Sequence, residues 1–160
     1  MILNPALGGR SPVMPDRISK EARSANMAAV RGRDTKPERI VRSRLFRAGF
    51  RYRLHERKLP GAPDVVLPRY RTAVFVHGCF WHGHDCPRGR RPNTNQEFWN
   101  VKIDANAARD RRNRTALEGL GWTVYTLWTC RLEADLEHLL NSLKALRAAE
   151  VTSEPRPPEN

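Results

Sequence analysis

The sequence predicts a mixed α/β domain in which a β-sheet is flanked by helices. Segments with helical spacing of apolar residues alternate with short apolar runs typical of strands, and no internal repeat interrupts this order. A chain of 160 residues is also long enough to bury one core. We expect one structured domain over residues 19–150. Residues 1–18, rich in Gly, Pro and Arg, predict a flexible arm, and residues 151–160, rich in Pro and Glu, predict a disordered tail.

Two helices are expected at the start of this domain. The sequence predicts a short one over residues 19–30. The next is better marked, because Thr35-Lys36-Pro37-Glu38 has the form of a capping box with proline in the first turn. Apolar residues with helical spacing follow, and Gly49 predicts the end of the helix.

The sheet and the remaining helices are predicted from the rest of the chain. Two apolar runs, residues 64–67 and 72–76, are separated by Pro68-Arg69-Tyr70-Arg71 and indicate two strands joined by a tight turn. Apolar spacing then predicts a helix over residues 96–117, a core strand over 123–127, and a leucine-rich helix over 132–146.

The charge of the chain favours a nucleic-acid partner. Its 29 Lys and Arg residues exceed its 17 acidic residues by 12, and the isoelectric point is about 10.7. A chain with such an excess of positive charge attracts polyanions. The sequence has no run of about 20 apolar residues and no lipidation motif, so a membrane partner is not expected. The first apolar run is too short for a secretory signal, and we expect a cytoplasmic protein.

All three cysteines lie near a dense group of histidines. The segment His77-Gly78-Cys79-Phe80-Trp81-His82-Gly83-His84-Asp85-Cys86 is joined by Cys130, just after the strand expected at residues 123–127. In a reducing compartment, cysteines so placed indicate a metal site. Zinc prefers four ligands of this kind, and a zinc ion whose four positions are all filled by protein side chains has a structural role. We predict that the four ligands are Cys79, His84, Cys86 and Cys130. His82 or His77 as the fourth ligand, or Cys130 as an ordinary core cysteine, remain alternatives.

Asp64 is the candidate ligand of a catalytic metal. It precedes an apolar run, so its carboxylate would project from the start of a rigid strand. A hard cation such as Mg²⁺ prefers carboxylate oxygens, neutralises charge on a phosphate and lowers the pKa of bound water. The alternative is an ordinary turn aspartate after proline.

Three further residues could take part in acid–base chemistry. His82 is the candidate general base, because an imidazole titrates near neutral pH. Asp110 could orient a catalytic histidine, although an acid within a run of arginines is more often part of a helix-surface ion pair. Glu38 already has a structural explanation in the capping box.

Several stretches together resemble the very-short-patch repair endonucleases, over about residues 17–147. The resemblance rests on residues 35–38, 63–66, 75–82, 109–112 and 128–130 of this sequence, of which the Gly-Cys-Phe-Trp-His block is the most specific.

The resemblance implies a restriction-endonuclease-like fold and a DNA substrate. Such enzymes nick double-stranded DNA on the 5′ side of the T in a T:G mismatch, which arises by deamination of 5-methylcytosine, and repair synthesis follows. We therefore expect a monomeric, nucleoid-associated enzyme, with mismatch-repair proteins and a repair polymerase as further partners.

The resemblance also implies roles for individual residues. Asp64 would bind magnesium together with the backbone carbonyl of Val76, where the family often has threonine. His82 would be the general base, and the waters around the metal would be ordered by Glu38, His77 and Asp110. The same four zinc ligands are implied as above.

An aromatic wedge is a further implication of the resemblance. Phe80, Trp81 and Trp99 would enter the duplex beside the mismatch, because rings between base steps unstack and bend DNA. Core packing is the structural alternative for these rings.

Two other functions compete with this hypothesis. One is a nuclease of the same fold with another mismatch or a restriction-type site as target, because no base-reading residue stands out among so many arginines. The other is a zinc-stabilised DNA-binding module without catalysis. A zinc deaminase is disfavoured, because the sequence lacks His-x-Glu with a paired Cys-x-x-Cys.

Overall fold

The computed structural model describes residues 33–153, and its elements follow the predicted order. They are α2 (Lys36–Arg47), β1 (Arg53–Leu54), β2 (Val65–Leu67), the 3₁₀ turn η1 (Pro68–Tyr70), β3 (Thr72–His77), the 3₁₀ turn η2 (Pro87–Gly89), α3 (Gln96–Gly119), β4 (Thr123–Trp128) and α4 (Leu132–Ser153). The expected arm over residues 1–18 and the helix over 19–30 lie outside the described residues.

The first described helix begins and ends where the sequence indicates. Thr35 is the N-cap of α2, and the reciprocal hydrogen bonds of a capping box with Glu38 are both present. Gly49 follows the helix with φ of +83°, a left-handed conformation that glycine adopts without strain.

The last helix is longer than expected. α4 runs to Ser153, three residues into the segment expected to be disordered. The sequence explains the difference, because no proline or glycine interrupts the chain between Leu132 and Pro155. Residues 154–160 lie outside the described part. Within residues 33–153, no helix has the length and apolar character that crossing a membrane requires.

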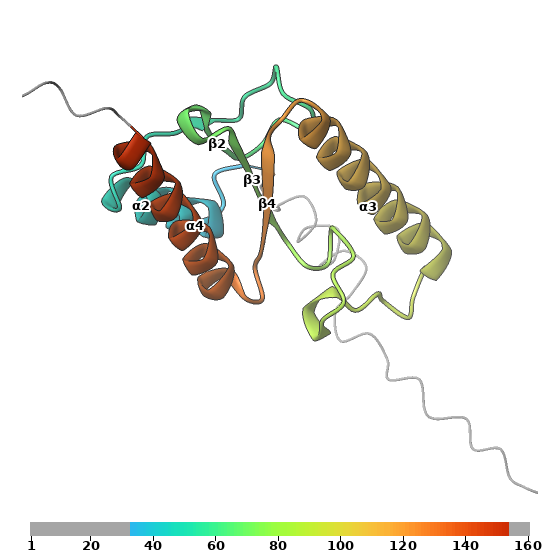
Figure 1. Ribbon diagram of the computed structural model, residues 1–160. Helices are drawn as coiled ribbons and strands as arrows, with labels where there is room; N and C mark the ends of the chain where they lie inside the picture. Colours follow the sequence, from blue (N-terminus) through green and yellow to red (C-terminus); the bar gives the residue numbers. More distant parts are fainter. Residues whose placement is uncertain (1–32, 154–160) are drawn as a thin grey trace, which may run out of the picture. The chain divides into compact units, whose positions relative to one another are not determined.

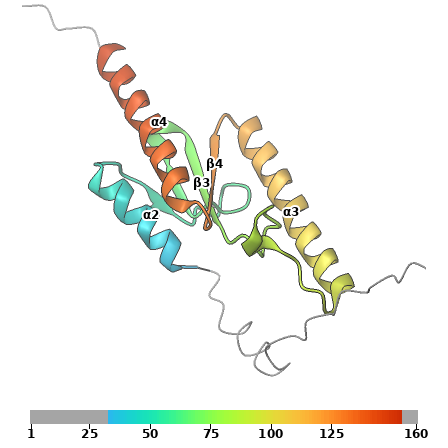
Figure 2. The same cartoon turned by 90° about the horizontal axis from the view of Figure 1, so that it is seen from below.

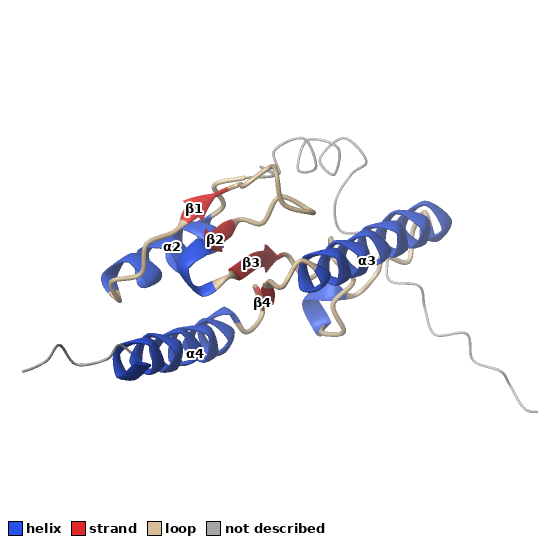
Figure 3. Ribbon diagram, turned by 45° about the horizontal axis from the view of Figure 1, so that its top comes forward, coloured by secondary structure: helices blue, strands red, loops and turns tan. Residues whose placement is uncertain are grey.

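The four strands form one mixed sheet in the order β1-β2-β3-β4. β2 is antiparallel to both of its neighbours, and β3 runs parallel to β4 from the pair Thr72↔Thr123 to the pair His77↔Trp128. Figure 3 shows the strands in this succession between the helices. The predicted hairpin of β2 and β3 is confirmed, whereas no residue range was predicted for β1.

Helices cover both faces of the sheet. α2 and α4 lie side by side against one face, and α3 lies against the other (Figures 1 and 2). Side chains alternate accordingly along β3, because successive residues of a strand point to opposite faces. Val74 belongs to the larger core with α2 and α4, whereas Ala73 packs with Leu117 of α3.

The parallel pairing of β3 and β4 positions the candidate site. Both strands end at the same edge of the sheet, with His77 opposite Trp128. The loop that begins at Gly78 and the turn that carries Cys130 therefore leave the sheet side by side, although they are about fifty residues apart in the sequence.

Candidate functional site

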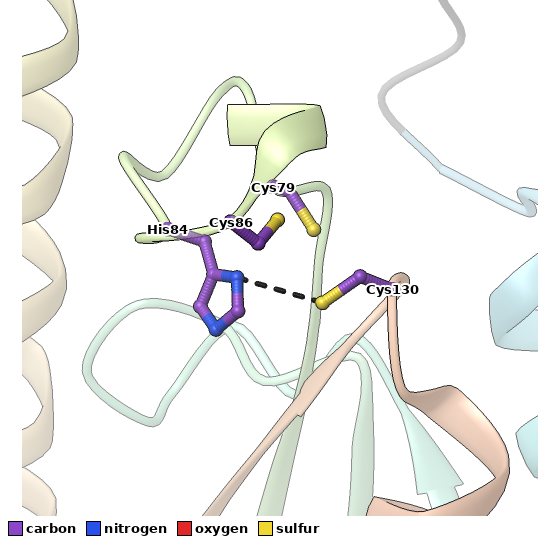
Figure 4. Close-up of side chains that lie close together, drawn as sticks. All are labelled: Cys79, His84, Cys86 and Cys130. Atoms are coloured by element: carbon purple, nitrogen blue, oxygen red, sulfur yellow. Dashed lines mark hydrogen bonds between the residues drawn. The ribbon is translucent and has the colours of Figure 1, made fainter. Parts of the chain in front are cut away.

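The loop after β3 and the end of β4 bring four metal-ligand side chains together. The ligand atoms of Cys79, His84, Cys86 and Cys130 all lie within 4.8 Å of one another. Three come from the loop and Cys130 from the turn after β4, and the Nδ1 atom of His84 lies 3.5 Å from the Cys130 sulfur (Figure 4). We refer to these four residues as the cysteine cluster. His77 and His82, the alternative ligands, belong to a different group.

Backbone hydrogen bonds shape this loop around its ligands. The His84 amide donates to the Cys79 carbonyl at 3.0 Å, and the Cys86 amide donates to the His84 carbonyl at 2.9 Å. Gly89 allows the closest approach, because a Cβ atom there would lie 1.9 Å from the His84 carbonyl oxygen. A side chain at position 89 would therefore displace the loop backbone that carries His84.

The thiols of Cys79 and Cys130 have pKa shifts in opposite directions. Burial, followed by hydrogen bonds to Cys79 and Cys86, raises the pKa of Cys130 to about 11. The pKa of Cys79 is lowered, because hydrogen bonds with Thr129 and the other two cysteines outweigh the effect of its burial. Once one thiol is ionised, ionisation of a second thiol beside it is therefore unfavourable unless a cation lies between them. Three sulfurs and one imidazole fit a tetrahedral zinc ion.

A second cluster lies on the α3 side of the sheet and consists of His77, His82 and Asp110, here called the histidine cluster. The Nδ1 atom of His82 lies 2.6 Å from a carboxylate oxygen of Asp110 on α3. The rings of His77 and His82 are stacked with centroids 3.7 Å apart. Asp110 therefore fixes the His82 ring and leaves Nε2 as the nitrogen that can exchange a proton with a substrate.

Burial determines the protonation state of His77. Its side chain is only 7% exposed, and burial, assisted by the adjacent His82, lowers its pKa to about 3. His77 is therefore neutral at neutral pH and provides an uncharged surface for the His82 ring.

A cavity of about 350 Å³ opens at the histidine cluster between α3 and the ends of β3 and β4. Its wall includes all three residues of the cluster together with Arg111 and Arg114. A base fixed by a carboxylate and flanked by guanidinium groups is suited to chemistry on an anionic substrate.

Asp64 lies at the same end of β3, directly before β2. One of its carboxylate oxygens accepts a hydrogen bond of 2.8 Å from the Val76 amide. Burial raises the pKa of Asp64, the Val76 hydrogen bond opposes this rise, and the nearby Glu38 carboxylate adds to it. A divalent cation would relieve both costs, and a carboxylate oxygen is a hard donor of the kind that Mg²⁺ prefers. The role of the Val76 carbonyl stays a prediction.

Asp64 and the histidine cluster both lie at the end of β3 and involve adjacent residues of that strand. Asp64 bonds to Val76, and the next residue, His77, belongs to the histidine cluster. Within residues 33–153, no hydrogen bond joins Asp64 directly to His82 or Asp110.

Glu38 is buried, with 3% of its surface exposed, and its charge is felt at Asp64. Its structural role in the capping box is confirmed. It also pairs with Arg42, one helical turn further along α2, at 2.7 Å. The spacing of four residues could have indicated this ion pair from the sequence.

The three proposed wedge residues form one aromatic group. Phe80 and Trp81 are half-buried, and the ring centroid of Phe80 lies 5.1 Å from those of both Trp81 and Trp99 in edge-to-face geometry. Trp99, on α3, is only 7% exposed. Accessible ring surface thus belongs to Phe80 and Trp81, and Trp99 packs beside them.

Two contacts of the aromatic group were missed by the sequence analysis. The ammonium group of Lys102 lies 5.5–5.9 Å from the ring centroids of Trp81, Phe98 and Trp99. The side chain of Asn106 donates a 2.9 Å hydrogen bond to the Trp81 carbonyl. Helical spacing from Phe98 could have identified Lys102, but no sequence signal connects Asn106 with a loop 25 residues earlier.

Comparison with known proteins adds an independent finding. A family model described as "DNA mismatch endonuclease Vsr" matches residues 15–88. The type II nicking enzyme V.XorIIP of Xanthomonas oryzae pv. oryzae is 47% identical over 134 residues, which cover 80% of this chain and 98% of the relative. V.NmeAIP of Neisseria meningitidis is 45% identical over 120 residues, covering 75% and 86%. DNA mismatch endonuclease Vsr of Escherichia coli is 44% identical over 119 residues, covering 74% and 76%.

The matched range of the family model contains one part of the candidate site. Asp64, His82 and the loop cysteines lie within residues 15–88, whereas Asp110 and Cys130 lie beyond them. The structure adds these two residues, because it places each within contact distance of the matched loop.

Proposed function

The chain belongs to the Vsr family of DNA mismatch endonucleases, and on this premise we propose that it nicks double-stranded DNA 5′ to the T of a T:G mismatch. In this proposal the mismatch arises by deamination of 5-methylcytosine, and the nick starts very-short-patch repair. The observation that carries the proposal is the 2.6 Å contact between His82 and Asp110 at the cavity wall, beside the strand end where Asp64 lies.

The residues of the site have separate tasks in this reaction. His82 takes the proton of the attacking water at Nε2, and the Asp110 carboxylate stabilises the imidazolium that forms. His77, neutral and stacked on His82, holds the ring from the other side without competing for the proton. Arg111 and Arg114 attract the phosphodiester to the cavity.

Asp64 would hold the catalytic Mg²⁺, together with the backbone carbonyl of Val76. When bound, this ion supplies positive charge for the phosphate as negative charge develops on it. Glu38 would order water around the metal together with His77 and Asp110. The Val76 amide keeps the Asp64 carboxylate in one orientation.

A structural Zn²⁺ would be held by the cysteine cluster, whose four ligand atoms come from two strand ends. With all positions filled by protein, it would fix the loop that carries Phe80, Trp81 and His82. Trp81 and Phe80 would enter the duplex beside the mismatch, and Trp99 would complete the wedge where the duplex reaches it.

The cellular setting follows from the same family membership. We propose a monomer that acts at the nucleoid in the cytoplasm and is followed by a repair polymerase, with mismatch-repair proteins as further partners. The net charge of +12 supports the DNA substrate.

A panel of duplexes tests the proposed function. Each duplex carries one strand label and differs from the others at a single pair: T:G, another mismatch, or the matched T:A and C:G pairs. With Mg²⁺, we expect one nick, on the 5′ side of the T, in the T:G duplex alone. Equal nicking of another mismatch or of a matched site would indicate a different target, and binding without any nick would indicate a non-catalytic module.

A further inference from the structure

A cluster of charged side chains surrounds Glu38 and is separate from the histidine cluster. Asp34, Glu38 and His55 offer ligand atoms within 4.8 Å of one another, as a metal site would. The guanidinium of Arg42 contacts all three: it pairs with Asp34, with Glu38 at 2.7 Å, and with the Nε2 atom of His55 at 3.1 Å. The place of a cation is thus taken by the chain's own arginine. We call these four residues the guanidinium cluster.

The Glu38 carboxylate is held on both of its oxygens. One oxygen accepts hydrogen bonds from Arg42 and, at 3.0 Å, from the Asp34 amide; the other accepts a 2.8 Å hydrogen bond from the Thr35 hydroxyl. Thr35 and Asp34 belong to the capping segment, so they place the carboxylate at the start of α2. Within the part of the chain that the structure describes, only Arg42 connects it to His55, which lies beyond β1.

Because Glu38 and Arg42 are buried, loss of these contacts would be energetically costly. Glu38 is 3% exposed and Arg42 is 9% exposed, so neither charge has much water around it. The Nε–H group of Arg42 is buried and has no acceptor within the described residues, which shows that its two terminal nitrogens determine where the side chain lies. An arginine stays charged in such a place, and loss of one partner leaves the other charge buried and unpaired.

The guanidinium cluster lies close enough to Asp64 for its charges to act there. Glu38 raises the pKa of Asp64, and His55 and Arg42 lower it. Arg42 therefore offsets part of the rise in the pKa of Asp64 that the Glu38 carboxylate causes.

We propose that Arg42 is a positioning residue of the nicking site, whose guanidinium keeps the Glu38 carboxylate and the His55 ring in one fixed arrangement beside Asp64. This inference rests on the proposed function, since it gives Glu38 its place in the nicking reaction. Arg42 itself acts through Glu38 and does not contact the DNA.

The first test compares Arg42→Met with Arg39→Met. Arg39 lies on the same helix but is exposed, so its loss removes the same charge without disturbing Glu38. In single-turnover nicking of the T:G duplex at saturating enzyme and Mg²⁺, Arg42→Met should be slower by on the order of 10- to 100-fold, as expected when a group in the site is misplaced by about 1 Å. Arg39→Met should keep the wild-type rate. A wild-type rate for Arg42→Met would overturn the inference.

A double-mutant cycle with Glu38→Gln shows whether Arg42 acts through Glu38. Because both changes remove the same arrangement, Arg42→Met should add little to the loss caused by Glu38→Gln. Two losses that multiply would contradict the inference. Arg42→Lys keeps the charge but cannot span the three partners, so it should also be slow; if Arg42→Met does not fold, a wild-type rate for Arg42→Lys overturns the inference in its place.

Calorimetric titration with Mg²⁺, without DNA, gives a readout apart from activity. Arg42→Lys keeps the positive charge near Asp64 but releases Glu38 from its fixed position, so its Kd for Mg²⁺ should rise, whereas Arg39→Met should match the wild type. A wild-type Kd in Arg42→Lys would contradict a positioning role for Arg42 at the Asp64 site. If the wild type fails to nick any duplex, the proposed function fails, and this titration still tests the inference.

Discussion

At the scale of single residues, the most informative pair is His82 and Asp110. They come from the loop after β3 and from the middle of α3, and their 2.6 Å contact leaves only one imidazole nitrogen for chemistry. An asparagine at position 110 could still form a hydrogen bond, but it would not stabilise the imidazolium and would favour the wrong tautomer.

Asp110→Asn should therefore fold normally and nick the T:G duplex more slowly by at least about 10²-fold, the usual contribution of a positioned acid or base. Single-turnover nicking at saturating enzyme measures the change. Asp104→Asn is the matched control, because Asp104 lies on the same helix in an exposed ion pair with Arg91. Equal losses in the two variants would show that Asp110 has no special role.

For Trp81, a role as a DNA wedge can be distinguished experimentally from a role in core packing. It is half-buried, and its ring contacts Phe80, Trp99 and the ammonium of Lys102. As a wedge it would contribute on the order of 1–3 kcal/mol to mismatch binding, whereas truncation of a core tryptophan costs about 3–5 kcal/mol of folding stability.

Trp81→Ala should thus weaken the preference for the T:G over the matched duplex more than it lowers the melting temperature. Competition binding and thermal melting of the same preparation measure both effects. Trp122→Ala provides the contrast, because Trp122 packs against the smaller core and should lose stability without loss of discrimination. A collapse of the Trp81→Ala melting temperature with unchanged discrimination would refute the wedge.

Single residues were predictable where their chemistry is visible in the sequence. The four residues of the cysteine cluster stand in a short loop and after a strand, and the fold brings their ligand atoms within 4.8 Å of one another, while their binding of zinc stays a prediction. Arg42 and His55 were not identified, because an arginine in a basic helix and a lone histidine after a strand carry no signal of their own. Only the folded chain shows that Arg42 contacts both Glu38 and His55 and that their charges act on the pKa of Asp64.

At the scale of elements, the parallel pair β3 and β4 determines where the chemistry lies. Because both strands end at one edge, the loop after β3 meets the turn after β4. A zinc ion in the cysteine cluster would join these two turns, and binding of metal to such a site adds to the free energy of unfolding.

Purified protein should contain one zinc per chain, and Cys130→Ser should lower both the zinc content and the melting temperature. Metal analysis and thermal melting of freshly prepared protein measure these quantities. The control is Asn141→Ala, an exposed change on α4 that should leave both unchanged. Absence of zinc from the wild type, or full zinc retention by Cys130→Ser, would contradict the assignment.

Elements were predictable in proportion to the strength of their local signals. The capping box of α2 and the hairpin of β2 and β3 follow from short motifs, and both are confirmed. β1 was missed, because two exposed residues show neither apolar alternation nor length. The end of α4 was set too early, because a Pro- and Glu-rich composition does not say at which residue a helix stops.

At the scale of the whole molecule, the described chain is a mixed sheet with α2 and α4 on one face and α3 on the other (Figure 1). The sequence predicts this class from the order of its elements. It does not predict which face each helix covers, because that choice depends on strand pairing between distant segments. The α3 face is nevertheless the one that matters, since α3 supplies Asp110 and Trp99 to loops of the sheet.

The central claim is that this arrangement cuts DNA and does more than bind it, and Asp64→Ala tests it most directly. Removal of one hard ligand spares the fold, so the variant should bind the T:G duplex as the wild type does and retain its zinc. In a Mg²⁺-dependent nicking assay beside a binding titration, the wild type should cut one strand of the T:G duplex and Asp64→Ala should cut neither. Substantial residual nicking by Asp64→Ala, at equal DNA binding, would contradict the account.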